Sequence, residues 1–391
     1  MIRIGSLGSR STALVDERGA LFCEALGWSL DWWIGADDRW RVPARENSVR
    51  QSRLADGPVV RTAVRVPSGD AVQTAYAVRA PHELVIWEIE NDSPAAFVVA
   101  LVIKGARAVN AAENIIFIDR RWGITTTRPA SRWSVGRAEE VDVEVCGGTA
   151  RTGPFPPIAD RAGRITGAFL FPVAHRTRLR FAISLSGSER SAPDIDLATL
   201  PDADAVARGW DAHLARGLRV ELPDAQIMSA LRSAQAEALL TASRNRPAPD
   251  LVAGLEDWGF DAEAATAWAR LTTRARRRYR PDLSGATWES LSTNSGDLLR
   301  QIRNLLVAEN SDEPKIEVLR HYPSSWRGQG VEVHNAPTLW GSVSFAVRWH
   351  GDRPALFWDI PVGVELSVPG LDADFVTSEP KGEMLLAANR T

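Results

Sequence analysis

The chain has 391 residues, of which 45% are hydrophobic and 24% charged, a composition typical of globular proteins and a length too great for one compact core. We therefore expect two or three domains. Its 46 lysines and arginines against 49 aspartates and glutamates give a formal charge of -3, which excludes the chain-wide basic field that nonspecific nucleic-acid binding uses. We expect no nucleic-acid partner.

Metal and cofactor motifs are missing from the sequence. Its two cysteines, Cys23 and Cys146, form no close-spaced pair, so neither a disulfide framework nor a cysteine zinc site is indicated. The six histidines form no spacing such as H-x-H or H-E-x-x-H, and there is no GxGxxG, P-loop or GxSxG motif. We expect no metal ion and no cofactor.

The amino-terminal residues contain no apolar run of about seven or more residues behind a basic start, which a secretory signal would need. The longest apolar run, residues 95–103, is far shorter than the roughly 18 residues that span a membrane. We expect a cytoplasmic protein without a membrane partner.

Residues 1–193 carry short apolar runs separated by Gly, Pro, Asn and Asp, the punctuation of antiparallel strands. The runs 59–66 and 71–78 flank a four-residue connection and predict one hairpin. The runs 83–90 and 95–103 predict a second, apolar on both faces, which indicates packed layers. Further candidate strands are 114–119, 133–135, 141–145, 165–173 and 178–185. The pattern predicts an N-terminal antiparallel β-sandwich.

From about residue 194 the composition changes to Ala, Leu and Arg, and the spacing of apolar residues becomes helical. We predict a helical domain over 194–314. The clearest amphipathic segment is 295–309, because its apolar residues fall on one face. These residues are Leu298, Ile302, Leu305 and Leu306. The other predicted helices are 202–216, one from Pro223 to about Asn245, 250–258 and 261–272. The arginine-rich run 274–280 is expected at the C-terminal end of the last of these helices, where the helix dipole favours cations.

The pattern returns to strands from Lys315, and we predict a separate small C-terminal β unit over 315–391. Residues 342–349 alternate between apolar and polar side chains, as a two-faced strand does. The other candidate strands are 316–319, 331–334, 355–359 and 364–368.

Two stretches carry a resemblance to a known family. The first is Trp32-Trp33-Ile34-Gly35-Ala36-Asp37-Asp38-Arg39-Trp40 with Val49-Arg50-Gln51 and Val64-Arg65-Val66-Pro67-Ser68-Gly69-Asp70. The second is Trp326-Arg327-Gly328-Gln329-Gly330-Val331-Glu332-Val333-His334-Asn335-Ala336-Pro337-Thr338 with Ser344-Phe345-Ala346-Val347-Arg348-Trp349-His350-Gly351. Together with the domain order, they resemble bacterial glucoamylase-like proteins of the six-hairpin glycosidase superfamily. The resemblance implies a carbohydrate-active protein that acts on or binds an α-linked glycan.

The middle of the chain is too short for the family's complete helical toroid. Six helical hairpins need roughly 190 residues as a minimum, more than residues 194–312 contain, and we place only four to six helices there. The expected architecture is therefore a shortened α/α-toroid-like helical domain between two β domains. Such an arc leaves an apolar helix flank without its usual neighbour, which either the β domains or a second chain must cover, and we favour a homodimer.

Glycoside hydrolysis usually requires two carboxylates roughly 5 to 10 Å apart. The resemblance places Glu289, which follows Trp288, where relatives have a Trp-Pro-Glu segment, although the proline is missing here. An acid beside an aromatic ring in a cleft would have a raised pKa. Glu256 and Asp257 are further candidates, but adjacent helical residues diverge by about 100° and do not form one site by themselves. Both also fit solvated charges at a helix end.

Aromatic residues are the candidates for sugar binding. The chain has 15 tryptophans and only 3 tyrosines, and flat rings beside hydrogen-bonding groups suit the apolar faces and hydroxyls of a pyranose. Trp32, Trp33 and Trp40 with Asp37, and separately Trp288, are the predicted binding residues. The alternative is that these rings fill a core. Two functions stay open: a glycoside hydrolase with an acid/base carboxylate pair, or a non-catalytic carbohydrate-binding or scaffold remnant of such an enzyme.

Overall fold

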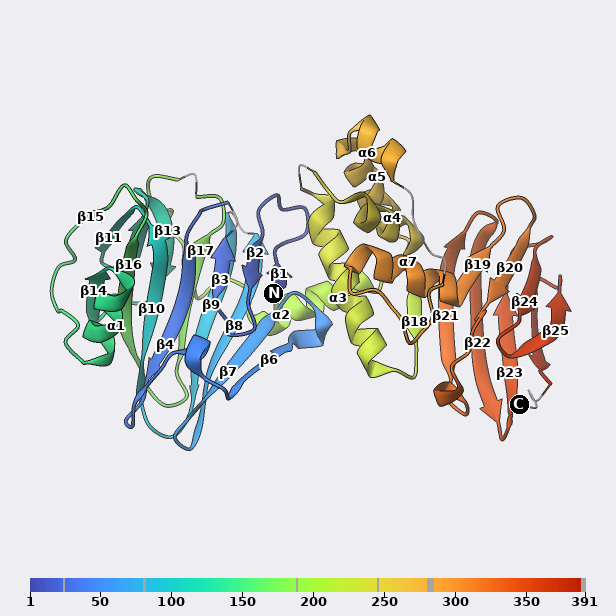
Figure 1. The fold of residues 1–391 in the computed structure, drawn as a ribbon, viewed down its shortest axis with the longest axis horizontal. Helices are drawn as coiled ribbons and strands as arrows, with labels where there is room; N and C mark the ends of the chain where they lie inside the picture. Colours follow the sequence, from blue (N-terminus) through green and yellow to red (C-terminus); the bar gives the residue numbers. More distant parts are fainter. Residues whose placement is uncertain (24, 80–81, 188, 245, 280–284, 388–391) are drawn as a thin grey trace. The chain divides into compact units, whose positions relative to one another are not determined.

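The computed structural model describes residues 1–23, 25–79, 82–187, 189–244, 246–279 and 285–387 (Figure 1). The chain divides into two compact units, Met1–Gly209 and Trp210–Thr391. Both combine β-sheets with helices, so the fold is of a mixed β and α class. The second unit contains both the segment predicted to be helical from residue 210 on and the predicted C-terminal β unit. Among the described residues, no helix is both long enough and apolar enough to cross a membrane.

The first unit contains two large antiparallel sheets. One has the order β1-β2-β3-β4-β10-β16-β14, with β5 paired to β4. Its strands are β1 (Ile2–Ile4), β2 (Ala13–Val15), β3 (Leu21–Cys23), β4 (Ser29–Gly35), β5 (Trp40–Arg41), β10 (Phe97–Ala106), β14 (Arg132–Gly136) and β16 (Ile165–Val173).

The other sheet has the order β15-β11-β12-β13-β17-β9-β8-β7-β6. Its strands are β6 (Val49–Arg53), β7 (Val60–Val66), β8 (Gly69–Arg79), β9 (Glu83–Asp92), β11 (Ala108–Ala112), β12 (Ile115–Ile118), β13 (Arg121–Thr126), β15 (Ile158–Ala159) and β17 (Arg178–Ser184). The hairpin expected around residues 67–70 is confirmed, but its turn is shorter, because Val66 pairs directly with Gly69. The second predicted hairpin, from the runs 83–90 and 95–103, is wrong, because β9 and β10 lie in different sheets.

One hydrophobic cluster draws side chains from both sheets. Leu101 and Phe171 come from the first sheet, and Trp87 and Phe181 come from the second. The rings of Phe171 and Phe181 meet edge to face with their centroids 5.2 Å apart. Apolar side chains from both sheets therefore form one shared core in this unit.

The strand predicted over residues 141–145 is wrong, because this segment lies in helix α1 (Ala138–Cys146). Val141 and Val145 are buried, whereas Val143 between them is 72% exposed. Valines four residues apart lie on the same face of a helix, and valines two residues apart lie on the same face of a strand. The valines of this segment are therefore compatible with either structure. Glu140 favours the helix locally, since its carboxylate accepts a hydrogen bond from the backbone N–H of Arg137 and caps the first turn.

A buried polar cluster fastens the end of the first unit to its second sheet. Glu88 is 3% exposed, and its carboxylate accepts hydrogen bonds from Tyr76 Oη at 2.7 Å and from Arg180 Nε at 2.8 Å. Arg180 also donates to the carbonyls of Leu197 and Pro201. Arg180 thus links the segment before the next helix to the buried Glu88 carboxylate, which would be destabilising without a positively charged partner.

Six helices follow in the described residues: α2 (Ala203–Leu214), α3 (Ala225–Ala242), α4 (Pro249–Asp257), α5 (Asp261–Arg270), α6 (Thr273–Arg278) and α7 (Ser295–Leu306). The arginine-rich run was predicted at the C-terminal end of the helix before it, but it forms a separate helix. Helix α5 ends at Arg270, and α6 contains Arg274, Arg276 and Arg277. Arg280 lies outside the described residues.

The apolar face predicted around Leu298 is confirmed, because all four of its side chains are buried. Helix α7 packs against α3 and α4, with Leu299 in contact with Gly254. The chain itself covers the face that suggested a dimer, so packing gives no reason for a second copy. The oligomeric state stays a prediction.

The second unit also contains two sheets. One has the order β18-β21-β22-β23-β26 and the other β19-β20-β24-β25, in which β20 and β24 run parallel. Their strands are β18 (Arg219–Glu221), β19 (Val307–Glu309), β20 (Lys315–Val318), β21 (Val331–Thr338), β22 (Gly341–His350), β23 (Arg353–Asp359), β24 (Glu365–Val368), β25 (Asp372–Thr377) and β26 (Lys381–Leu385). The helical domain was predicted to include residues 219–221 and 307–309, but these residues are strands of the two sheets.

The buried Arg303 connects α7 to these sheets. Its guanidinium donates to the carbonyls of Val307 and Pro337 and forms an ion pair with Glu309 at 3.0 Å. A helix end and two strands from separate sheets therefore share one cation.

Replacing Arg180 with methionine should lower the free energy of unfolding by about 3 kcal/mol, because the buried Glu88 carboxylate loses its main partner. Arg178→Met is the matched control. Arg178 lies 3.3 Å from the same carboxylate, but its side chain is 48% exposed, and its loss should cost less than about 1 kcal/mol. Chemical denaturation measures both, and equal losses would contradict this account.

Candidate functional site

The predicted N-terminal sugar-binding residues do not form one exposed surface. Trp32 is fully buried between the sheets, and its indole N–H donates to the carbonyl of Arg18. Trp33, on the other face of β4, is 4% exposed and packs with the half-buried Trp40. Asp37 is exposed. The rings of Trp32 and Trp33 therefore serve packing, and neither presents a flat face to a sugar.

The three predicted catalytic carboxylates belong to two different segments. Glu256 and Asp257 end helix α4. Asp257 forms an ion pair with Arg300 at 2.8 Å, and partial burial raises the pKa of both carboxyls. Glu289 is exposed in the segment before α7. Asp257 is thus paired with an arginine, and the catalytic role of the three carboxylates stays a prediction.

Trp288 leads to an aromatic cluster that the sequence did not single out. Its ring is buried, and its indole N–H donates to the carbonyl of His321 at 2.8 Å. It packs on Trp326 with ring centroids 4.6 Å apart. Trp288 therefore supports a second layer of rings rather than facing solvent itself.

Tyr322 and Trp349 form the outer layer of this cluster. Tyr322 meets Trp326 edge to face at 6.0 Å and Trp349 at the same distance with a 48° tilt. The indole N–H of Trp349 donates to Tyr322 Oη at 3.2 Å, and this hydroxyl lies 2.9 Å from the Gln329 carbonyl that it can donate to. Both outer rings are only half-buried, so they are fixed in orientation and still accessible.

These two rings line a cavity of about 430 Å³, a size within the roughly 300 to 1,000 Å³ of small-molecule sites. The other lining residues are Arg327, Gly328, Gly351, Asp352, Pro354, Gly370 and Leu371. Gly370 permits a close approach, since a Cβ there would lie 2.2 Å from the Leu319 carbonyl oxygen. Arg327 and Asp352 are exposed, and their side chains have no hydrogen-bond or ion-pair partner among the described residues.

The cavity thus combines two oriented aromatic faces with a free cation and a free carboxylate. The apolar faces can take a ring's C–H groups, while the charged groups can accept or donate hydrogen bonds to hydroxyls. Within the described residues, no group of three or more His, Cys, Asp and Glu side chains is placed to hold a metal ion.

Sequence reasoning missed Tyr322, Trp349, Arg327 and Asp352 as site residues. A signal for two of them was present, because the segments 326–328 and 349–351 each place a tryptophan and a basic residue directly before a glycine. Both of these glycines, Gly328 and Gly351, have positive φ angles of 80° and 61° and turn the chain at the cavity.

No protein-family model matches the chain, and the comparison with curated proteins finds no match.

Burial raises the pKa of all three tyrosines, Tyr76, Tyr279 and Tyr322. The folded protein therefore holds these protons at pH values where the unfolded chain, with pKa values of about 10, releases them. Their contribution to stability is complete below about pH 10 and is lost as the pH rises further. Absorbance titration should show phenolate forming at higher pH in the native than in the denatured protein, and Tyr322→Phe should remove one native step. Superimposable curves would contradict the packing described for Tyr322.

Proposed function

We propose that this chain is a carbohydrate-binding protein and that the cavity lined by Tyr322 and Trp349 receives the sugar. The observation that carries the proposal is the pair of half-buried, hydrogen-bonded rings flanked by the unpaired Arg327 and Asp352. A pyranose has an apolar face that packs on such a ring and hydroxyls that the two charged groups can bind.

The two sequence segments that resemble glucoamylase-like proteins at the C-terminal side both reach this cavity. Residues 326–338 supply Arg327 and Gly328, and residues 344–351 supply Trp349 and Gly351. The proposed ligand class and the proposed family relationship are therefore consistent with each other, and an α-linked glucan is the natural first ligand to test.

We favour binding over hydrolysis, because the described lining of the cavity contains one carboxylate, Asp352. A glycosidase of the usual kind needs two. Glu289, Glu256 and Asp257 do not line this cavity. The function is thus that of a non-catalytic relative of such enzymes.

On this proposal the first unit is a β-sandwich and helices α2 to α7 are a shortened α/α toroid. Support for the sandwich comes from the hydrophobic cluster shared by the two sheets. Support for the toroid comes from the number of helices, which is half of what six hairpins contain. The loss of hairpins fits the loss of a second catalytic carboxylate.

Titration calorimetry with maltoheptaose should show saturable binding to the full chain. Trp349→Ala should weaken it about five- to thirtyfold, because a stacked ring contributes roughly 1 to 2 kcal/mol. Trp340→Ala is the matched control. Trp340 is also half-buried in the second unit and hydrogen-bonded, through its indole N–H, to Asn310, but it does not line the cavity. Equal affinity of both variants, or no binding by the parent chain to any of a panel of glucans, would reject the proposal.

The same samples separate binding from hydrolysis. Reducing ends should not accumulate when the protein is incubated with maltoheptaose. Their release by the parent chain, with loss of release in Glu289→Gln, would make the chain a hydrolase instead.

A further inference from the structure

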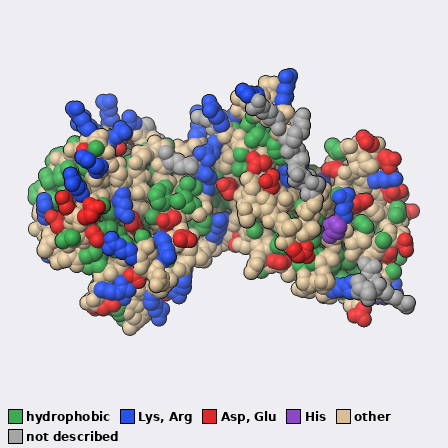
Figure 2. Space-filling model, in the orientation of Figure 1, with side chains coloured by type: hydrophobic (Ala, Val, Ile, Leu, Met, Phe, Trp, Pro, Cys, Tyr) green, Lys and Arg blue, Asp and Glu red, His purple; other side chains and the backbone are tan. Residues whose placement is uncertain are grey.

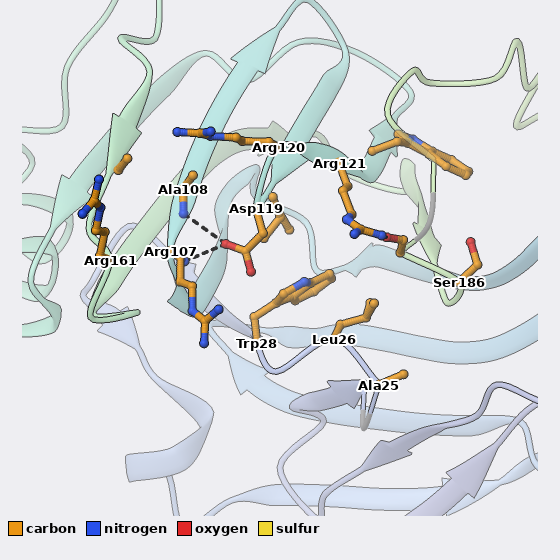
Figure 3. A pocket seen from close by; sticks show the side chains of 14 residues that line it. Ala25, Leu26, Trp28, Arg107, Ala108, Asp119, Arg120, Arg121, Arg161 and Ser186 are labelled. Atoms are coloured by element: carbon orange, nitrogen blue, oxygen red, sulfur yellow. Dashed lines mark hydrogen bonds between the residues drawn. The ribbon is translucent and has the colours of Figure 1, made fainter.

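A second cavity lies in the first unit, far along the sequence from the aromatic site, and its lining is basic (Figure 3). It has a volume of about 700 Å³ and is formed by loops that leave both sheets at one end. Its charged residues are Arg107, Arg120, Arg121, Arg161 and Asp119. On the face drawn in Figure 2, basic side chains gather at the end of this unit where β11, β13 and β15 lie.

Three separate connections bring the four arginines together. Arg107 joins β10 to β11, Arg120 and Arg121 lie at the β12–β13 turn, and Arg161 follows β15. Figure 3 shows Arg161 on one side of Asp119 and Arg121 on the other. All four side chains are exposed at the cavity.

The one described carboxylate in the lining is already engaged. Asp119 Oδ1 accepts the backbone N–H groups of Arg107 at 2.7 Å and Ala108 at 3.0 Å. Arg121 donates to the carbonyl of Gly187 at 2.7 Å. None of the four guanidinium groups forms an ion pair with a carboxylate in the described part of the chain. Like charges gathered in this way repel one another unless an anion lies between them.

The turn that presents Arg120 is strained. Asp119 and Arg120 have φ angles of 53° and 64°, which lie in the left-handed region. In a two-residue hairpin turn of this kind, the second turn residue is normally glycine. An arginine there carries a conformational cost that glycine would avoid. Arg120 also lines an adjoining cavity of about 380 Å³. The turn thus places the side chain of Arg120 in the lining of both cavities.

We propose that this arginine-lined cavity binds a small anion that carries two or more phosphate or carboxylate groups. Planar guanidinium groups bind both kinds of group through paired hydrogen bonds. Because several arginines here lack a carboxylate partner, a ligand with several negative charges fits the cavity better than a ligand with one negative charge. The site is independent of the carbohydrate cavity, which lies in the other unit.

The test is calorimetry with pyrophosphate and with citrate, which separates phosphate from carboxylate ligands. The parent chain should bind at least one of them, more weakly as the ionic strength rises. Arg120→Gly should weaken that binding about tenfold or more through the loss of a charge-assisted contact. Because glycine suits the turn, this variant should fold at least as stably as the parent chain.

Arg176→Gly is the matched control. Arg176 is an exposed arginine of the same unit with a φ angle of 54°, and it does not line the cavity. It should bind like the parent chain. Arg161→Gln supplies a second reduction of affinity from a different loop.

Two outcomes overturn the proposal. One is binding of neither anion by the parent chain, or equal binding by all variants. The other is that a single-stranded oligonucleotide binds more tightly than either small anion, and that Arg120→Gly and Arg176→Gly weaken this binding equally. The binding site would then be a diffuse basic surface instead of the cavity.

Discussion

A buried indole calls for an acceptor for its single N–H. Several described tryptophans of this chain meet that requirement, whereas the N–H of the fully buried Trp87 has no hydrogen-bond partner among the described residues. For Trp33 and Trp122 the acceptor lies on the same strand. For seven others it lies on a connection or on another element: Trp32 to Arg18, Trp133 to Gly153, Trp258 to Leu299, Trp288 to His321, Trp340 to Asn310, Trp349 to Tyr322 and Trp358 to Glu379. Each of these seven bonds joins a ring in a packed layer to a loop or neighbouring element. The surplus of tryptophan thus has a structural role throughout the chain.

The rings differ in how far they are available to a ligand. Trp32 is wholly buried, although its acceptor is the carbonyl of the half-buried Arg18 in the turn between β2 and β3. At Trp349 the acceptor is another half-exposed ring, Tyr322, so the bond orients the indole without covering it. Arginines follow a parallel rule. Arg180 and Arg303 have carboxylate partners and hold elements together, whereas Arg120 has none and faces a cavity.

Local periodicity predicted the elements that bury one clear face, such as β7 and α7. It failed at 141–145, where alternate valines fit either period, and at β18, a three-residue strand whose partner β21 lies more than a hundred residues away. The carboxylates Glu256, Asp257 and Glu289 were found by residue type, but no local signal says which of them face a common cavity. Tyr322 and Trp349 meet only through tertiary packing, and the arginines of the first unit come from three separate loops.

Chemical modification of tryptophan tests the central claim at the level of single residues. N-bromosuccinimide oxidises accessible indoles, and peptide mapping reports each of them. With saturating maltoheptaose, oxidation of Trp349 should slow while that of Trp340 is unchanged, because only Trp349 lines the proposed sugar cavity. Oxidation of Trp349 at the same rate with and without the sugar would contradict the account.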